Sequence, residues 1–96
     1  MVYSVSLSGV ANWSRKGAET MDKPLAVGLI LEEYENAIKE NPPFVSHHEG
    51  CSVIREEFEE LWDEVKKKKG KRDKEKLTKE AKQVGAMAMR FMIDLL

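Results

Sequence analysis

The sequence predicts a single all-α domain in which an N-terminal helix precedes an antiparallel helical hairpin. From residue 24 onward, apolar side chains recur at the helical spacings of three and four. The helical stretches are bounded by prolines, glycine and short polar residues, which are the usual residues at helix ends. Strand-like alternation is confined to residues 2–7. The expected organisation is therefore one domain over residues 1–96, irregular over 1–22 and helical over 23–96.

The composition narrows the class of protein. The chain has 96 residues, of which 42% are hydrophobic and 34% charged, as expected of a folded, water-soluble domain. Its 16 basic and 17 acidic side chains nearly cancel, so the overall charge does not favour nucleic acid as a partner. No apolar run approaches the roughly 20 residues of a membrane span, and the first residues lack the features of a secretion signal. A cytoplasmic protein that binds no membrane is expected, and its one cysteine, Cys51, is expected to be inert.

The first helix is predicted to begin at Pro24, a favoured first helical residue, and to end where Pro42 and Pro43 prevent continuation. Ser46 is then a good N-cap for the next helix. That helix is expected over residues 49–69, with Gly70 as its stop. Its stripe of apolar residues consists of Ile54, Phe58, Leu61, Trp62 and Val65.

The third helix is predicted to follow an N-cap at Asp73 and to continue to the end of the chain or nearly so. Charge separates sharply around the turn between the last two helices. Residues 49–64 carry one basic and seven acidic side chains, whereas residues 65–79 carry nine basic and two acidic ones. Because the basic run contains no aromatic residue on which bases could stack, it is interpreted as a solvated turn rather than an RNA-binding surface.

Acidic residues flank the apolar stripe on both helices of the hairpin. At about 100° per residue, Glu57 and Glu60 lie along one edge of their helix, and Glu80 and Gln83 lie along the equivalent edge of the next. If the chain turns near Gly70, positions 57 and 83 are level, as are positions 60 and 80. These four side chains are therefore expected to converge at the edge of the core.

Converging carboxylates repel one another unless a cation lies between them. Oxygen ligands without histidine or cysteine favour a hard ion, Mg²⁺ or Mn²⁺, and the crevice of a helical bundle is a common place for such an ion. The simpler alternative is that Glu57, Glu60 and Glu80 are surface charges paired with lysines. Glu64, farther along, is expected to pair with Lys68 four residues later.

The acidic residues of the two hairpin helices resemble the paired motifs of a known protein family. Residues 56–60 have the form EExxE, and residues 80–83 correspond to an ExxD motif on the following helix. Together with the residues around them, from 46 to 96, they look like the MazG-like all-α nucleoside triphosphate pyrophosphohydrolases, in particular the small phage and prokaryotic branch. The resemblance covers about half of the chain.

The resemblance implies a helical bundle, often completed by a second subunit, in which Mg²⁺ binds a nucleoside triphosphate that is cleaved to a monophosphate and pyrophosphate. Carried over by position, Glu57, Glu60 and Glu80 match metal ligands. The fourth position departs from the pattern, because Gln83 stands where the family has Asp. A neutral amide can offer its oxygen but adds no charge. Weak, altered or lost activity is therefore open, and the water-activating residue is not identified.

Two further expectations concern binding. Arg90 could reach the acidic patch or a substrate phosphate, or form a salt bridge with Glu49 or Glu57. The last helix carries more apolar surface than one neighbour can bury, which predicts a homodimer or homotetramer. The alternative function is a non-catalytic helical oligomer that binds a nucleotide or a protein partner.

Overall fold

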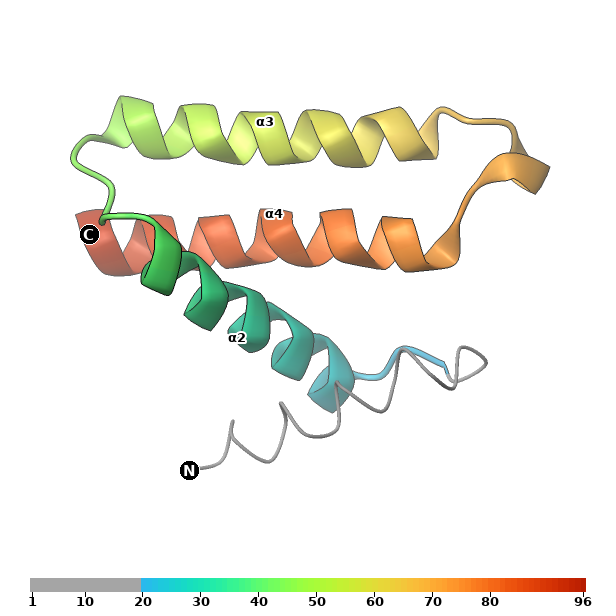
Figure 1. The fold of residues 1–96 in the computed structure, drawn as a ribbon, viewed down its shortest axis with the longest axis horizontal. Coiled ribbons are helices and arrows are strands. Elements are labelled where there is room, and N and C mark those ends of the chain that lie inside the picture. Colours follow the sequence, from blue (N-terminus) through green and yellow to red (C-terminus); the bar gives the residue numbers. More distant parts are fainter. Residues whose placement is uncertain (1–19) are drawn as a thin grey trace.

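The computed structural model describes residues 20–96, and in this part of the chain the all-α prediction is confirmed. The structure consists of α2 (Lys23–Glu40), α3 (His47–Val65), a short 3-10 turn, η1 (Lys69–Lys71), and α4 (Lys74–Leu95). The helices α3 and α4 lie side by side and antiparallel, and α2 crosses α4 obliquely (Figure 1). Most of the segment predicted to be irregular, including the alternation at 2–7, falls outside the described residues. No helix among residues 20–96 is long and apolar enough to cross a membrane.

The bounds of α2 agree with the residues that predicted them. The carboxylate of Asp22 caps its start by accepting a hydrogen bond from the backbone N–H of Leu25 at 2.9 Å. Pro24 lies in the first turn, where its missing N–H costs nothing. The helix ends at Glu40, just before Asn41 and the two prolines.

The start of α3 also follows the prediction, two residues earlier than expected. Ser46 is the N-cap, and its hydroxyl accepts a hydrogen bond from the Glu49 backbone N–H at 3.0 Å. In return, the Glu49 carboxylate accepts one from the Val45 N–H at 2.7 Å. This reciprocal pair resembles a capping box and fixes the angle at which the chain enters α3.

The predicted end of this helix at residue 69 is wrong, because α3 ends at Val65. Beyond it, Arg72 folds back and donates to the carbonyl of Val65 at 2.8 Å, which satisfies one of the acceptors that a helix end leaves open. The lysines at 66–69 therefore occupy the turn and the start of η1. Gly70 is therefore part of η1 and not a helix stop.

Asp73 caps α4 as predicted, accepting hydrogen bonds from the backbone N–H groups of Glu75 and Lys76. The helix lies close to α3 at Gly50, where an added Cβ would lie 2.6 Å from the Phe91 ring. Because 50 and 91 are level in the predicted register, this approach confirms the alignment of the hairpin. A second close approach joins Gly85 to Ile30 of α2.

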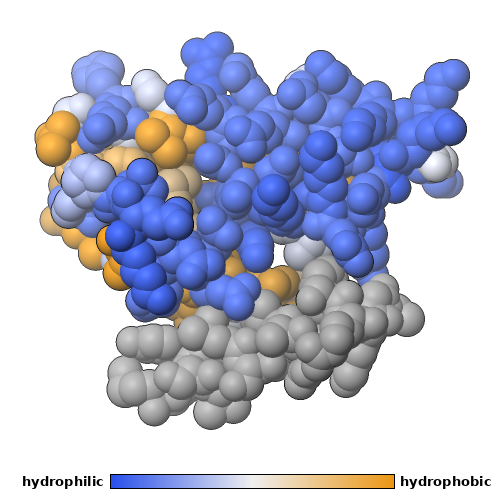
Figure 2. Space-filling view, viewed as in Figure 1, coloured by the Kyte–Doolittle hydropathy of each residue, from blue (hydrophilic) through white to orange (hydrophobic). Residues whose placement is uncertain are grey.

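The core lies where the three helices meet and is small. Its buried apolar residues include Ala37, Phe44, Ala86 and Met87. The stripe predicted for α3 is only partly covered, since Phe58 is 54% exposed and Trp62 50% exposed. Figure 2 shows hydrophilic side chains over most of α3 and the hairpin turn, with hydrophobic ones gathered at the opposite end. The described chain thus leaves considerable apolar surface uncovered.

Candidate metal centre

The hairpin brings three of the predicted ligands together. Carboxylate oxygens of Glu57 and Glu60 on α3 and of Glu80 on α4 all lie within 4.8 Å of one another. We call these three residues the carboxylate cluster. Glu80 is buried, Glu57 half-buried and Glu60 exposed, so the cluster is anchored in the bundle and opens to solvent at one side. None of the three forms a salt bridge with a lysine or arginine among residues 20–96, contrary to the alternative of paired surface charges.

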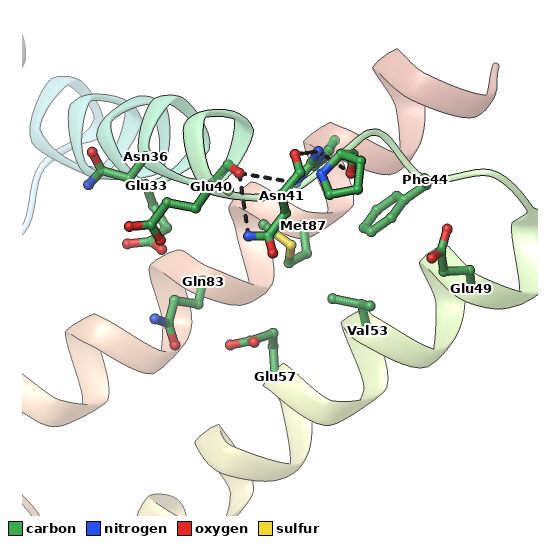
Figure 3. Close-up of a pocket in the computed structure, with 13 residues that line it drawn as sticks. Glu33, Asn36, Glu40, Asn41, Phe44, Glu49, Val53, Glu57, Gln83 and Met87 are labelled. Atoms are coloured by element: carbon green, nitrogen blue, oxygen red, sulfur yellow. Dashed lines mark hydrogen bonds between the residues drawn. The ribbon is translucent and has the colours of Figure 1, made fainter.

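Gln83 joins the cluster through its amide. With the carboxamide nitrogen turned toward α3, it donates to Glu57 Oε2 at 2.9 Å and to Glu80 Oε1 at 2.9 Å. The side chains of Gln83 on α4 and Glu57 on α3 face each other between the two helices (Figure 3). Gln83 therefore bridges two carboxylates as a hydrogen-bond donor, a role that an aspartate could not perform when ionised.

The carboxylates of the cluster are electrostatically strained without a cation. Burial, followed by the nearby charges of Glu60 and Glu80, raises the pKa of Glu57 above its ordinary value. Burial and then Glu60 raise the pKa of Glu80, although Lys79 and Lys76 partly offset the effect. Both groups consequently favour a proton or a metal ion close by.

The donor set fits a hard divalent cation with two adjustments. Mg²⁺ binds oxygen at about 2.1 Å, so opposite ligands lie about 4.2 Å apart, slightly closer than the widest separation in the cluster. A small inward movement of the carboxylates would close the site around the ion. Gln83 would also have to turn its amide over, because only its oxygen can ligate a metal.

Arg90 neither reaches the carboxylate cluster nor forms a salt bridge with Glu49 or Glu57, the two roles expected from the sequence. It is buried, and its guanidinium donates to Asp94 at 3.1 Å and to the carbonyls of Ala37, Asn41 and Pro42. The expected salt bridge with Glu49 or Glu57 is not formed, because Asp94 takes that role. Asp94 also accepts a hydrogen bond from the Phe44 N–H at 2.9 Å. Arg90 and Asp94 thus fasten the α2–α3 connection to α4.

Glu64 is the residue that sequence reasoning placed least well. Its expected partner was Lys68, but it pairs with Lys67 at 2.8 Å and accepts a hydrogen bond from the Asp73 N–H at 2.9 Å. These contacts, the first above all, lower the pKa of this buried carboxyl. Glu64 thereby ties the end of α3 to the start of α4. In the sequence, its position beside the acidic edge of the helix is the only indication that this carboxylate lies next to α4.

Two hollows adjoin the carboxylate cluster from different directions. The larger, which we call the α2 pocket, has a volume of about 380 Å³ and reaches from Glu57 and Gln83 to α2, as Figure 3 shows. Its acidic walls include Glu33, Glu40 and Glu49. The smaller, the turn pocket, has a volume of about 290 Å³ and is lined by Glu60, Asp63, Glu64, Lys67, Lys76 and Glu80.

No protein-family profile, curated protein or solved structure matches this chain.

Proposed function

We propose that this protein is a Mg²⁺-dependent nucleoside triphosphate pyrophosphohydrolase that cleaves its substrate to a monophosphate and pyrophosphate. The observation that carries the proposal is the carboxylate cluster, in which the EExxE and ExxD-like segments meet and no carboxylate forms a salt bridge with a lysine or arginine of residues 20–96. Mn²⁺ is the natural substitute, since it prefers the same oxygen ligands.

The chemistry requires a metal ion for a physical reason. The triphosphate carries about four negative charges, so an acidic site would accept it only with divalent cations that neutralise part of this charge. Water then attacks the α-phosphorus, and the bond from that phosphorus to the α–β bridging oxygen breaks. Pyrophosphate leaves with the bridging oxygen, and the proton of the water is lost to solvent.

Different residues would bind the metal ion and shape the substrate pocket. Glu57, Glu60 and Glu80 would hold the ion, with the Gln83 oxygen as a neutral fourth ligand. Arg90 is not proposed as a substrate ligand, because its guanidinium is occupied by Asp94 and backbone carbonyls. Its contribution is to hold the α2–α3 connection that forms one wall of the α2 pocket.

The test is pyrophosphate release from a panel of ribo- and deoxyribonucleoside triphosphates with Mg²⁺, comparing the native protein with Glu60→Gln. Release by the native protein that falls at least 100-fold in this variant is expected, because the variant removes one charge from the metal. Glu59→Gln is the matched control, since Glu59 is exposed on the same helix and pairs with Arg55 instead. Equal rates in all three proteins, or no release at all, would favour the non-catalytic alternative.

We also propose that the protein is a homodimer or homotetramer. Phe58 and Trp62 on α3 and Met92 and Ile93 on α4 are each at least half exposed, more apolar surface than a small soluble monomer usually presents. Sedimentation equilibrium at micromolar concentration is expected to give a mass of two or four chains. Replacing Phe58 and Trp62 by serine is expected to shift it toward the monomer, whereas a native protein that sediments as a monomer would overturn this part.

A further inference from the structure

The two hollows beside the carboxylate cluster differ in the charges that they present. The α2 pocket is bordered by the carboxylates of Glu33, Glu40, Glu49 and Glu57, and its one basic residue is Arg90. Because the Arg90 guanidinium is already bound to Asp94 and three carbonyls, it does not counter those charges. Of the four carboxylates, Glu33 alone forms a salt bridge within residues 20–96, with Lys82 at 3.9 Å. A phosphate chain would therefore be repelled from this pocket.

The turn pocket offers what the α2 pocket lacks. It contains two ammonium groups, those of Lys67 and Lys76, together with four carboxylates. Two of these carboxylates, Asp63 and Glu64, pair with Lys66 and Lys67, and the other two, Glu60 and Glu80, belong to the cluster. Lys67 uses one of its three donors on Glu64. Lys76 forms no salt bridge within the described residues, although its charge is felt by both Glu64 and Glu80. Both lysines thus retain donors for an anion.

The cluster lies between these hollows, since Glu57 borders the α2 pocket while Glu60 and Glu80 border the turn pocket. We infer that a bound nucleoside triphosphate lies across the cluster in one direction, with its nucleoside in the α2 pocket and its pyrophosphate end on Lys67 and Lys76. This inference rests on the proposed function. The volume of about 380 Å³ is in the range of small-molecule pockets, and the uncharged nucleoside is the part that acidic walls tolerate.

The experiment measures the two halves of the substrate separately, by calorimetric titration of the full chain with Mg²⁺ and inorganic pyrophosphate, or with Mg²⁺ and each of the common nucleoside monophosphates. Lys76→Gln is expected to weaken pyrophosphate binding about tenfold, the loss of one charge-assisted hydrogen bond, and to leave monophosphate binding within about twofold. Asn36→Trp, which adds bulk on the α2 side of the larger pocket, is expected to weaken monophosphate binding only.

Lys71→Gln is the matched control, because it removes the same charge from η1, outside either pocket. Lys67→Gln is a second test, and its thermal denaturation must be compared with that of the native protein because Lys67 also neutralises buried Glu64. The inference fails if Lys76→Gln behaves like Lys71→Gln, if it weakens both ligands equally, or if the native protein binds neither ligand.

The outcomes separate this inference from the proposed function. Pyrophosphate release from triphosphates that is insensitive to Lys76→Gln would leave the hydrolase intact and refute only the orientation. Split binding of the two halves without any release would support the orientation and refute hydrolysis.

Discussion

At the scale of single residues, Gln83 governs how the carboxylate cluster behaves without a metal ion. Its amide nitrogen bridges Glu57 and Glu80, which replaces part of the attraction that a cation would supply. The same amide contributes no charge when a metal is bound. The proposed metal site would thus be more stable without an ion, and would bind cations more weakly, than a site with four carboxylates.

Gln83→Glu tests this role, because glutamate has the same length and places a fourth charge in the same position. Mg²⁺ affinity is expected to rise about tenfold by titration calorimetry, as ligand charge strongly tunes such sites. The metal-free variant is expected to unfold at a lower temperature, since a donor has become a fourth repelling group. Asn36→Glu adds the same charge on α2 outside the cluster, and an equal gain in that control would contradict the assignment.

At the scale of elements, the connection between α2 and α3 depends on one buried ion pair. Arg90 and Asp94 together bind two carbonyls and one N–H of this connection, and Arg90 also binds the carbonyl of Ala37 in the last turn of α2. The Arg90 guanidinium also lies 5.3 Å from the centre of the Phe44 ring, which covers it. Removal of either charge would leave its partner buried and uncompensated.

Arg90→Ala is accordingly expected to destabilise the fold by about 3–5 kcal/mol, measured by urea denaturation. Arg55→Ala provides a matched comparison, because Arg55 also pairs with an acid four residues later, Glu59, but in full contact with solvent. That change is expected to cost at most about 0.5 kcal/mol. Similar losses in the two variants would show that the α2–α3 connection is not held in the way described.

The sequence predicts the helices and their bounds better than it predicts contacts between distant residues. The caps Ser46 and Asp73 and the break at Pro42 act locally, so their effects could be predicted without knowing the fold. The register of the hairpin followed from the turn and brought Glu57, Glu60 and Glu80 together as expected. Hydrogen-bond and salt-bridge partners that come together only in the folded protein cannot be predicted from caps and helical spacing.

Arg90 and Glu64 illustrate that limit. The carbonyls that bind Arg90 come from residues about 50 positions away, and no periodicity in α4 indicates them. Helical spacing predicts Lys68 as the partner of Glu64, but α3 ends at Val65 and the spacing does not apply beyond it. The α2 pocket likewise depends on where α2 crosses α4, which the sequence does not predict.

At the scale of the whole molecule, buried carboxyls make stability depend on pH in two opposite ways. The raised pKa values of Glu57 and Glu80 mean that the folded protein takes up protons before the unfolded chain does as the pH falls from neutral. Stability therefore increases toward the ordinary glutamate pKa of about 4.3. The lowered pKa of Glu64 acts oppositely, since its contribution is present above that value and is lost as the pH falls through the lowered pKa.

The metal-free protein is thus expected to have its highest melting temperature near pH 5, lower at pH 7.5 and lower again below about pH 4. Circular dichroism melts across this range, in the presence of a chelator, provide the measurement. Saturating Mg²⁺ is expected to raise the melting temperature mainly at the higher pH, because the ion and the protons compete for the same carboxylates. A melting temperature that falls steadily from pH 7.5 to 5 without metal would contradict the raised pKa values.

The proposed function depends on a divalent metal site between α3 and α4 of the hairpin. Its most direct test is calorimetric titration of Mg²⁺ and Mn²⁺ into the native protein, Glu57→Gln, Glu80→Gln and the exposed control Glu59→Gln. Binding by the native protein and the control, lost in both other variants while helicity is unchanged, is the predicted result. Metal binding that survives both substitutions, or that is absent from the native protein at millimolar ion concentrations, would contradict the claim.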